Sequence, residues 1–271
     1  MAVDHSFWLK KIEKLDELYV LCSEYTHHPF VVCDEETFDD MAYIFTTAEM
    51  CRAFAQQFIT DKYVLHEVQI EKEMIPGVLT SFFLLGINAV MFQDEGAPVK
   101  IPLEEIAMKP DLEVPKNAPI PEANPELQLT GLYFMQELNR PGEKSAEEKI
   151  RLSELEAEMA HYLLNSRYIV AFDVTDVKGD WNPEDPNQQV RVPIVSTPNG
   201  HKFQPVYTDY GEMQMFNRTA IGRKFKMTAV PYERLMEYHF KEAEGFVINP
   251  GGFNLILTVD QMNEMARRYA E

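Results

Sequence analysis

The stretch AYIFTTAEMCRAFAQQF, residues 42–58, has a counterpart later in the chain, QPVYTDYGEMQMFNR, residues 204–218. In both, an apolar strand-like run ends in an aromatic residue and a threonine, Thr46 or Thr208, and a phenylalanine follows at the same distance. A helix-like run begins directly after each threonine. Two such matched stretches indicate that the chain is built from a duplicated unit.

Four more pairs of segments follow these two stretches in the same order. Each pair reads in turn as a strand, a helix, a second strand and a second helix. The pairs are YVLHEVQI (63–70) with KFKMTAVP (224–231), VLTSFFLLG (78–86) with RLMEYHFKEAEG (234–245), NAVMF (88–92) with FVIN (246–249), and IPLEEIAM (101–108) with LTVDQMNEMA (257–266).

An upstream helix is predicted in each unit, over residues 6–24 and 145–165, because apolar residues recur there at spacings of three and four. Ser145 and Glu148 have the spacing of a capping box at the start of the second helix. The strands predicted to follow these helices are FVVCD (30–34) and YIVAFDV (168–174).

The predicted element order of each unit is α-β-β-α-β-α-β-α, which is an α+β fold. We therefore expect two related α/β-sandwich units in tandem, each a mixed sheet covered by helices. Prolines crowd the sequence between them, and proline disfavours both helix and central strand. The predicted domains are a first unit over 1–108, a proline-rich linker over 109–130 and a second unit over 131–271.

Residues 74–92 carry no charge over nineteen positions, which approaches the length of a membrane span. The matching segment of the second copy contains Glu233, Arg234 and Glu237, so we predict a helix and a strand in both copies and no membrane contact. The helix from Val78 to Leu85 has no polar face and should be buried on more than one side. It would pack against the other half, against a second chain in a homo-oligomer, or deeper within its own unit.

The net charge of −19, from 44 acidic and 25 basic residues, disfavours binding to nucleic acid or to anionic membranes. The three cysteines, Cys22, Cys33 and Cys51, match no metal or disulfide pattern and predict reduced thiols in a cytoplasmic protein. The histidines are scattered without the spacing of a metal site. We expect neither a metal nor a cofactor.

The segment GFVINPGGF, residues 245–253, combines glycines with a proline beside an apolar run. It lacks the spacing of either common phosphate-binding loop, and an apolar run follows it where such loops need a helix. We predict a type II turn with Pro250 second and Gly251 third. An anion site is the alternative, with Asn249, Gly251 and Gly252 as candidate binding residues.

Two acidic loops, DEETFDD (34–40) and DVTDVKGDWNPEDPNQQ (173–189), are predicted at the same place in the repeat. The second carries Trp181 in its middle, and an exposed loop aromatic is typical of recognition sites. Both loops are either solvated or a contact surface for a partner, and cation binding is a further alternative. The candidate contact residues of the second loop are Trp181, Asp180, Glu184 and Asp185.

These landmarks resemble the SseB N-terminal domain of the enhanced-serine-sensitivity proteins. The family motifs are an apolar pair with threonine before an acidic helix, and a later Asn-Pro-Gly turn. The second copy matches better, at Val206, Tyr207, Thr208, Asn249, Pro250 and Gly251, whereas the first keeps Ile44, Phe45 and Thr46 but has Phe92, Gln93 and Asp94 in place of the turn.

The resemblance implies an α+β unit and supplies no catalytic residues. We therefore expect a non-catalytic bacterial protein that acts as a protein-interaction or regulatory module, with a partner protein still to be identified. The alternative is a small-molecule-binding protein or hydrolase whose site lies at the junction of the two units. That alternative requires a deep pocket with convergent polar groups.

Overall fold

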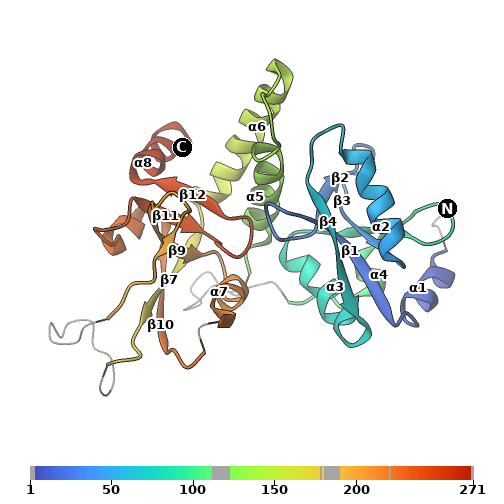
Figure 1. Cartoon of the computed structure of the whole chain (residues 1–271), viewed down its shortest axis with the longest axis horizontal. Coiled ribbons are helices and arrows are strands. Elements are labelled where there is room, and N and C mark those ends of the chain that lie inside the picture. Colours follow the sequence, from blue (N-terminus) through green and yellow to red (C-terminus); the bar gives the residue numbers. More distant parts are fainter. Residues whose placement is uncertain (1–3, 112–122, 178, 180–189, 220, 270–271) are drawn as a thin grey trace. The chain divides into compact units, whose positions relative to one another are not determined.

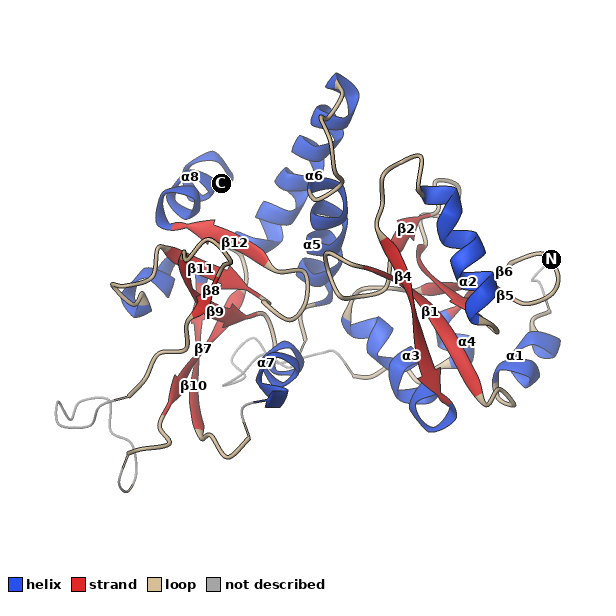
Figure 2. Ribbon diagram, viewed as in Figure 1, coloured by secondary structure: helices blue, strands red, loops and turns tan. Residues whose placement is uncertain are grey.

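The structure is a computed structural model of the chain. It divides into two compact units, Met1–Leu112 with Gln128–Leu155, and Glu113–Leu127 with Glu156–Glu271. Each unit contains one mixed, six-stranded sheet (Figure 1; Figure 2). The residues that the structure describes are 4–111, 123–177, 179, 190–219 and 221–269.

The first unit begins with a short helix and then alternates strands with helices. Its elements are α1 (Ser6–Ile12), β1 (Glu17–Ser23), β2 (Val31–Cys33), β3 (Asp40–Phe45), α2 (Ala48–Ala55), the 3-10 helix η1 (Gln56–Phe58), β4 (Leu65–Glu71), η2 (Lys72–Met74), α3 (Ile75–Leu84), β5 (Ala89–Gln93), β6 (Val99–Pro102) and α4 (Leu103–Ile106).

Two longer helices, α5 (Pro125–Leu138) and α6 (Ala146–Leu164), follow. The predicted capping box of α6 is confirmed, because the Ser145 N–H donates to Glu148 Oε2 at 2.7 Å and the Glu148 N–H to Ser145 Oγ at 3.1 Å. The second unit then contains β7 (Arg167–Asp173), β8 (Val195–Ser196), β9 (Lys202–Tyr207), α7 (Tyr210–Phe216), η3 (Asn217–Thr219), β10 (Phe225–Pro231), η4 (Tyr232–Tyr238), β11 (Gly245–Ile248), β12 (Leu255–Thr258) and α8 (Val259–Tyr269).

Both sheets follow one plan. Their strand orders are β4-β1-β3-β5-β6 and β10-β7-β9-β11-β12, with β2 and β8 paired to β3 and β9. In each, the pair β3–β5 or β9–β11 is parallel and the other pairs are antiparallel. The register is also shared, since Ile44 opposite Phe92 corresponds to Val206 opposite Ile248. The predicted fold class, two related α+β units in tandem, is confirmed.

The predicted helix over residues 6–24 is wrong in its second half. The helix ends at Ile12, and Glu17–Ser23 form β1, a central strand of the first sheet. A strand buried on both faces reads as one apolar run and is not separated from a helix by its periodicity. Each unit has six strands where four were predicted, and 168–174 corresponds to β1 rather than to 30–34. The two acidic loops consequently lie at different places in the repeat.

Two other predicted segments differ in the structure. Residues 234–245, predicted as a helix, contain the end of the 3-10 helix η4 rather than an α-helix. Within the predicted linker 109–130, a helix begins at Pro125, where proline is tolerated because a first-turn N–H has no partner in the helix. Most of that helix, from Gln128 on, belongs to the first unit, which differs from the predicted boundary at 131.

Helix α3 covers the predicted apolar segment from Val78 to Leu85. Leu79, Phe82 and Phe83 are buried within the first unit, where α3 packs against α4 and β4. This packing favours the alternative of a deeper core in its own unit. Within the described ranges, every helix is too short or too polar to cross a bilayer.

Each sheet is covered on both faces. In the first unit, Leu21, Tyr43 and Phe45 face α2, and Trp8 of α1 packs on Phe92 from the other side. In the second unit, a cluster that includes Ile169 and Ala171 faces α7. The intervening residues, such as Tyr168, which contacts Tyr232, face η4, because side chains alternate along a strand.

Gly245 permits the close approach of β11 and β12. A Cβ atom at this position would lie 2.1 Å from the Leu257 carbonyl oxygen. We expect Gly245→Ala to lower the free energy of unfolding by about 1–3 kcal/mol, as overpacking does. Chemical denaturation measures the loss. Gly77→Ala is the matched control, since no atom lies within 4 Å of its Cβ, and it should leave the stability unchanged or slightly higher. Equal effects of the two substitutions would contradict the steric explanation.

Candidate functional site

Asn249 joins the carboxyl ends of the two parallel strands of the second sheet. It follows β11, is fully buried and has a φ of +48°, a conformation that asparagine tolerates better than most residues. Its Oδ1 accepts the Thr208 N–H at 2.9 Å, and its Nδ2 donates to Thr208 Oγ1 at 2.8 Å. The amide therefore closes a two-bond clip between the ends of β9 and β11.

The same network starts helix α7. The Thr208 hydroxyl donates to Asp209 Oδ2 at 2.8 Å, and Asp209 Oδ1 accepts the Glu212 N–H at 3.0 Å as the helix cap. Thr208, Asp209 and Glu212 are all buried. One chain of side-chain hydrogen bonds therefore fixes two strand ends and one helix start.

The turn predicted after β11 is present, but it is not of type II. The Gly252 N–H donates to the Asn249 carbonyl at 2.9 Å, which places Pro250 second and Gly251 third as predicted. Gly251 is not in the left-handed region that a type II turn requires, and that conformation falls on Asn249 instead. Because both amide atoms of Asn249 bond to Thr208, neither is directed to an anion.

The first unit makes a related clip with different residues. By the shared register, Gln93 stands at the position of Asn249. The sequence comparison places Phe92 there, one residue earlier. The Thr46 N–H donates to the Gln93 carbonyl at 3.2 Å, and the Thr46 hydroxyl donates to Asp94 Oδ1 at 3.0 Å. Asp94 also pairs with Lys11. The carboxylate of Asp94 thus bonds to Thr46, where the amide of Asn249 bonds to Thr208 in the second unit.

The first acidic loop, 34–40, is held by a lysine of its own unit. Lys100 Nζ lies 2.8 Å from both Asp34 Oδ2 and Asp39 Oδ2. The hydrogen bond from Lys100 lowers the pKa of Asp34 to about 2, together with backbone hydrogen bonds to the same carboxylate. At the tip, Phe38 is 76% exposed with a φ of +57°. The aromatic residue of this loop is therefore displayed on a well-bonded turn.

The candidate residues of the second acidic loop, Asp180, Trp181, Glu184 and Asp185, lie outside the described residues. Cys22 and Cys51 are buried as predicted, and Cys33 is half-buried. Burial raises the pKa of both buried thiols to about 12, so neither is a thiolate at neutral pH. Among the described residues, no three His, Cys, Asp or Glu side chains form a metal-binding group.

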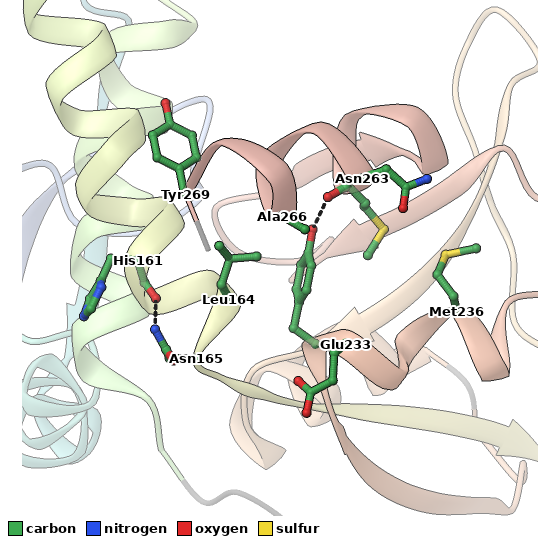
Figure 3. Close-up of a pocket in the computed structure, with 10 residues that line it drawn as sticks. His161, Leu164, Asn165, Glu233, Met236, Asn263, Ala266 and Tyr269 are labelled. Atoms are coloured by element: carbon green, nitrogen blue, oxygen red, sulfur yellow. Dashed lines mark hydrogen bonds between the residues drawn. The ribbon is translucent and has the colours of Figure 1, made fainter. Parts of the chain in front are cut away.

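The sequence did not indicate a cavity in the second unit that lies between α6, η4 and α8 (Figure 3). Its volume is about 440 Å³. His161 and Leu164 come from α6, Asn165 from the turn after it, Met236 from η4, and Ala266 and Tyr269 from α8 (Figure 3). No local motif marks it, because three segments far apart in the sequence each supply a few ordinary residues.

Two polar side chains of this cavity are engaged within the protein. The buried Tyr232 hydroxyl donates to the Met262 carbonyl at 3.0 Å, and Asn165 Nδ2 donates to the His161 carbonyl at 2.8 Å. Two methionines, Met236 and Met262, line the cavity. Methionine is flexible and polarisable, so it adapts to partners of different shapes. The cavity is suited to binding apolar groups.

The Asn249 clip can be tested without disturbing the backbone. Asn249→Gly keeps the left-handed φ accessible and removes the amide, while Asn254→Gly does the same at a second asparagine with a φ of +54°. Because the buried Thr208 groups lose their amide partner, we expect Asn249→Gly to lower the free energy of unfolding by about 1–3 kcal/mol more than Asn254→Gly does. Urea denaturation compares the two variants. Indistinguishable stabilities would contradict the clip.

The role of Lys100 predicts a change in titration. In Lys100→Met, the pKa of Asp34 should rise from about 2 toward its ordinary range, as followed by carboxyl NMR. Because the folded-state pKa is lowered, the stabilisation by this pair is present above the unfolded-state pKa and is lost as the pH falls through the folded-state pKa. Lys72→Met, which breaks the Asp16 pair elsewhere, is the control and should leave Asp34 unchanged.

Comparison with known proteins finds a family match for part of the second unit. No curated protein matches the chain. Two solved structures do, each at 10% identity: Anabaena Tic22 (protein transport), covering 85% of both chains with a TM-score of 0.21, and Tic22 from Plasmodium falciparum, covering 95% of this chain and 94% of that chain with a TM-score of 0.20. Both TM-scores are low, so neither similarity carries an inference. The family model of the SseB protein N-terminal domain matches residues 148–264, so the second unit carries an SseB-like domain.

Proposed function

We propose that the protein is a non-catalytic interaction module whose second unit receives an apolar side chain of a partner protein. The observation that supports this function is the cavity between α6, η4 and α8, with its two methionines and two tyrosines. Its volume lies within the range of specific binding sites. Eight of its ten lining residues fall within the SseB-like region, and Ala266 and Tyr269 follow it.

The chemistry of the lining favours binding over catalysis. Glu233 is the single carboxylate among the ten lining residues, all of which are described, and no hydrogen bond joins it to His161. A hydrolytic site needs a nucleophile or water held between an acid–base pair. The lining combines methionine, leucine and alanine with two tyrosines, and tyrosine is enriched at protein-binding hot spots.

We propose also that the first unit is a diverged copy of the SseB-like domain. The shared strand order, the shared register and the threonine at the end of β3 support this relationship. Pairing of two copies through Val78–Leu85 has less support, because Leu79, Phe82 and Phe83 are already buried inside their unit. A cytoplasmic location agrees with the free cysteines.

The proposed function predicts the result of a peptide selection. Peptides selected from a displayed random library on the wild-type protein should lose at least tenfold in affinity for Met236→Asp, since a carboxylate would occupy the apolar cavity. Met236 is 40% exposed, so the variant should fold. Met108→Asp is the control, because Met108 is 84% exposed elsewhere, and it should bind as the wild type does. Failure to select any peptide, or equal binding by both variants, would contradict the proposal.

A further inference from the structure

A second hollow lies in the second unit, between α7 and β10, on the sheet face opposite to the cavity described above. Its volume is about 710 Å³ and it is open to solvent. Apolar side chains of both elements line it: Met213 and Met215 from α7, and Phe225 and Met227 from β10. Met213 is buried, whereas the other three are half-buried. The hollow therefore leaves apolar surface accessible on one side.

The first unit differs from the second at two positions that border the hollow. By the shared register, Glu67 opposite Leu21 corresponds to Met227 opposite Ala171. In the first unit, Arg52 of α2 reaches across to Glu67, with Nε 2.6 Å from Oε1. The corresponding positions in the second unit are Gln214 and Met227, which cannot form an ion pair. The ion pair that joins helix and strand in the first unit is therefore absent at the hollow.

The charge at the rim of the hollow is opposite to that of the chain. The lining contains Arg218 and Arg223 and no acidic residue, although the protein as a whole carries −19. Arg223 is held in place by the buried carboxylate of Asp173. Arg218 is exposed and forms no ion pair with any described residue. A guanidinium beside methionines suits a ligand that is both acidic and apolar.

We propose that this hollow binds an acidic peptide segment of a partner protein that carries an apolar side chain. The apolar side chain enters between Met215, Phe225 and Met227. The flanking carboxylates of the peptide pair with Arg218 and with the part of the Arg223 guanidinium that does not contact Asp173. Because the hollow is open and shallow, the contact is weak and depends on salt. This site shares no lining residue with the cavity at Met236.

The test uses three short fluorescein-labelled peptides and measures anisotropy at low salt. The first has one phenylalanine flanked by glutamates, the second replaces that phenylalanine with serine, and the third replaces the glutamates with lysines. We expect the first to bind, with roughly tenfold loss for either replacement and for Arg218→Glu. Lys226→Glu is the charge control, since this exposed β10 residue does not line the hollow, and it should bind almost as the wild type does.

A double variant tests the shape of the hollow apart from its charge. Gln214→Arg with Met227→Glu reinstates the bridge of the first unit, keeps the net charge and should abolish binding. If this variant does not fold, Arg218→Glu still decides the matter. Met236→Asp should leave binding unchanged, which separates this site from the proposed function. Absence of binding, preference for the lysine peptide, or no effect of Arg218→Glu would overturn the proposal. Self-association of the wild type that Arg218→Glu removes would assign the hollow to a second copy instead and would also overturn it.

Discussion

The side-chain amide of Asn249 links the ends of the parallel strands β9 and β11, and the start of helix α7 depends on this link. Parallel strands β9 and β11 are joined through α7, β10 and η4, so no tight turn fixes their ends. The amide supplies that link, with both of its polar atoms bonded to Thr208. Since the Thr208 hydroxyl also contacts the cap of α7, the position of that helix depends on the same network.

The first unit meets the same geometric requirement with other chemistry. Thr46 keeps the place of Thr208, but its hydroxyl bonds to Asp94, whose charge Lys11 balances. A polar group away from water is costly unless it is paired. Where the Asn249 amide has no counterpart, the carboxylate of Asp94 therefore serves as the partner of the threonine. This explains why the threonine recurs in both copies while the Asn-Pro-Gly turn does not. The repeated element is the link between the parallel strands rather than any one sequence motif.

This difference also explains what the sequence could and could not indicate. Matched segments predicted the duplication because the ladder registers are shared, and the capping box of α6 is a local signal that needs no tertiary contact. Strand β1 was missed because both of its faces are buried, which removes the alternation that marks a strand. The helix start at Pro125 was missed because a first-turn proline resembles the prolines before it. Both hollows were missed because each depends on contacts between distant segments.

The surfaces of the two units differ outside the sheets that they share. In the first unit the carboxylates of Asp34 and Asp39 are neutralised by Lys100, and Arg52 closes the gap beside β4 by pairing with Glu67. These three carboxylates are thus engaged in pairs within the unit. The second unit lacks the corresponding bridge, and its two openings on opposite faces of one sheet both expose methionine. A sheet core fixes strand register while helix–sheet gaps tolerate substitution, so the two units share their strand order and differ in these gaps.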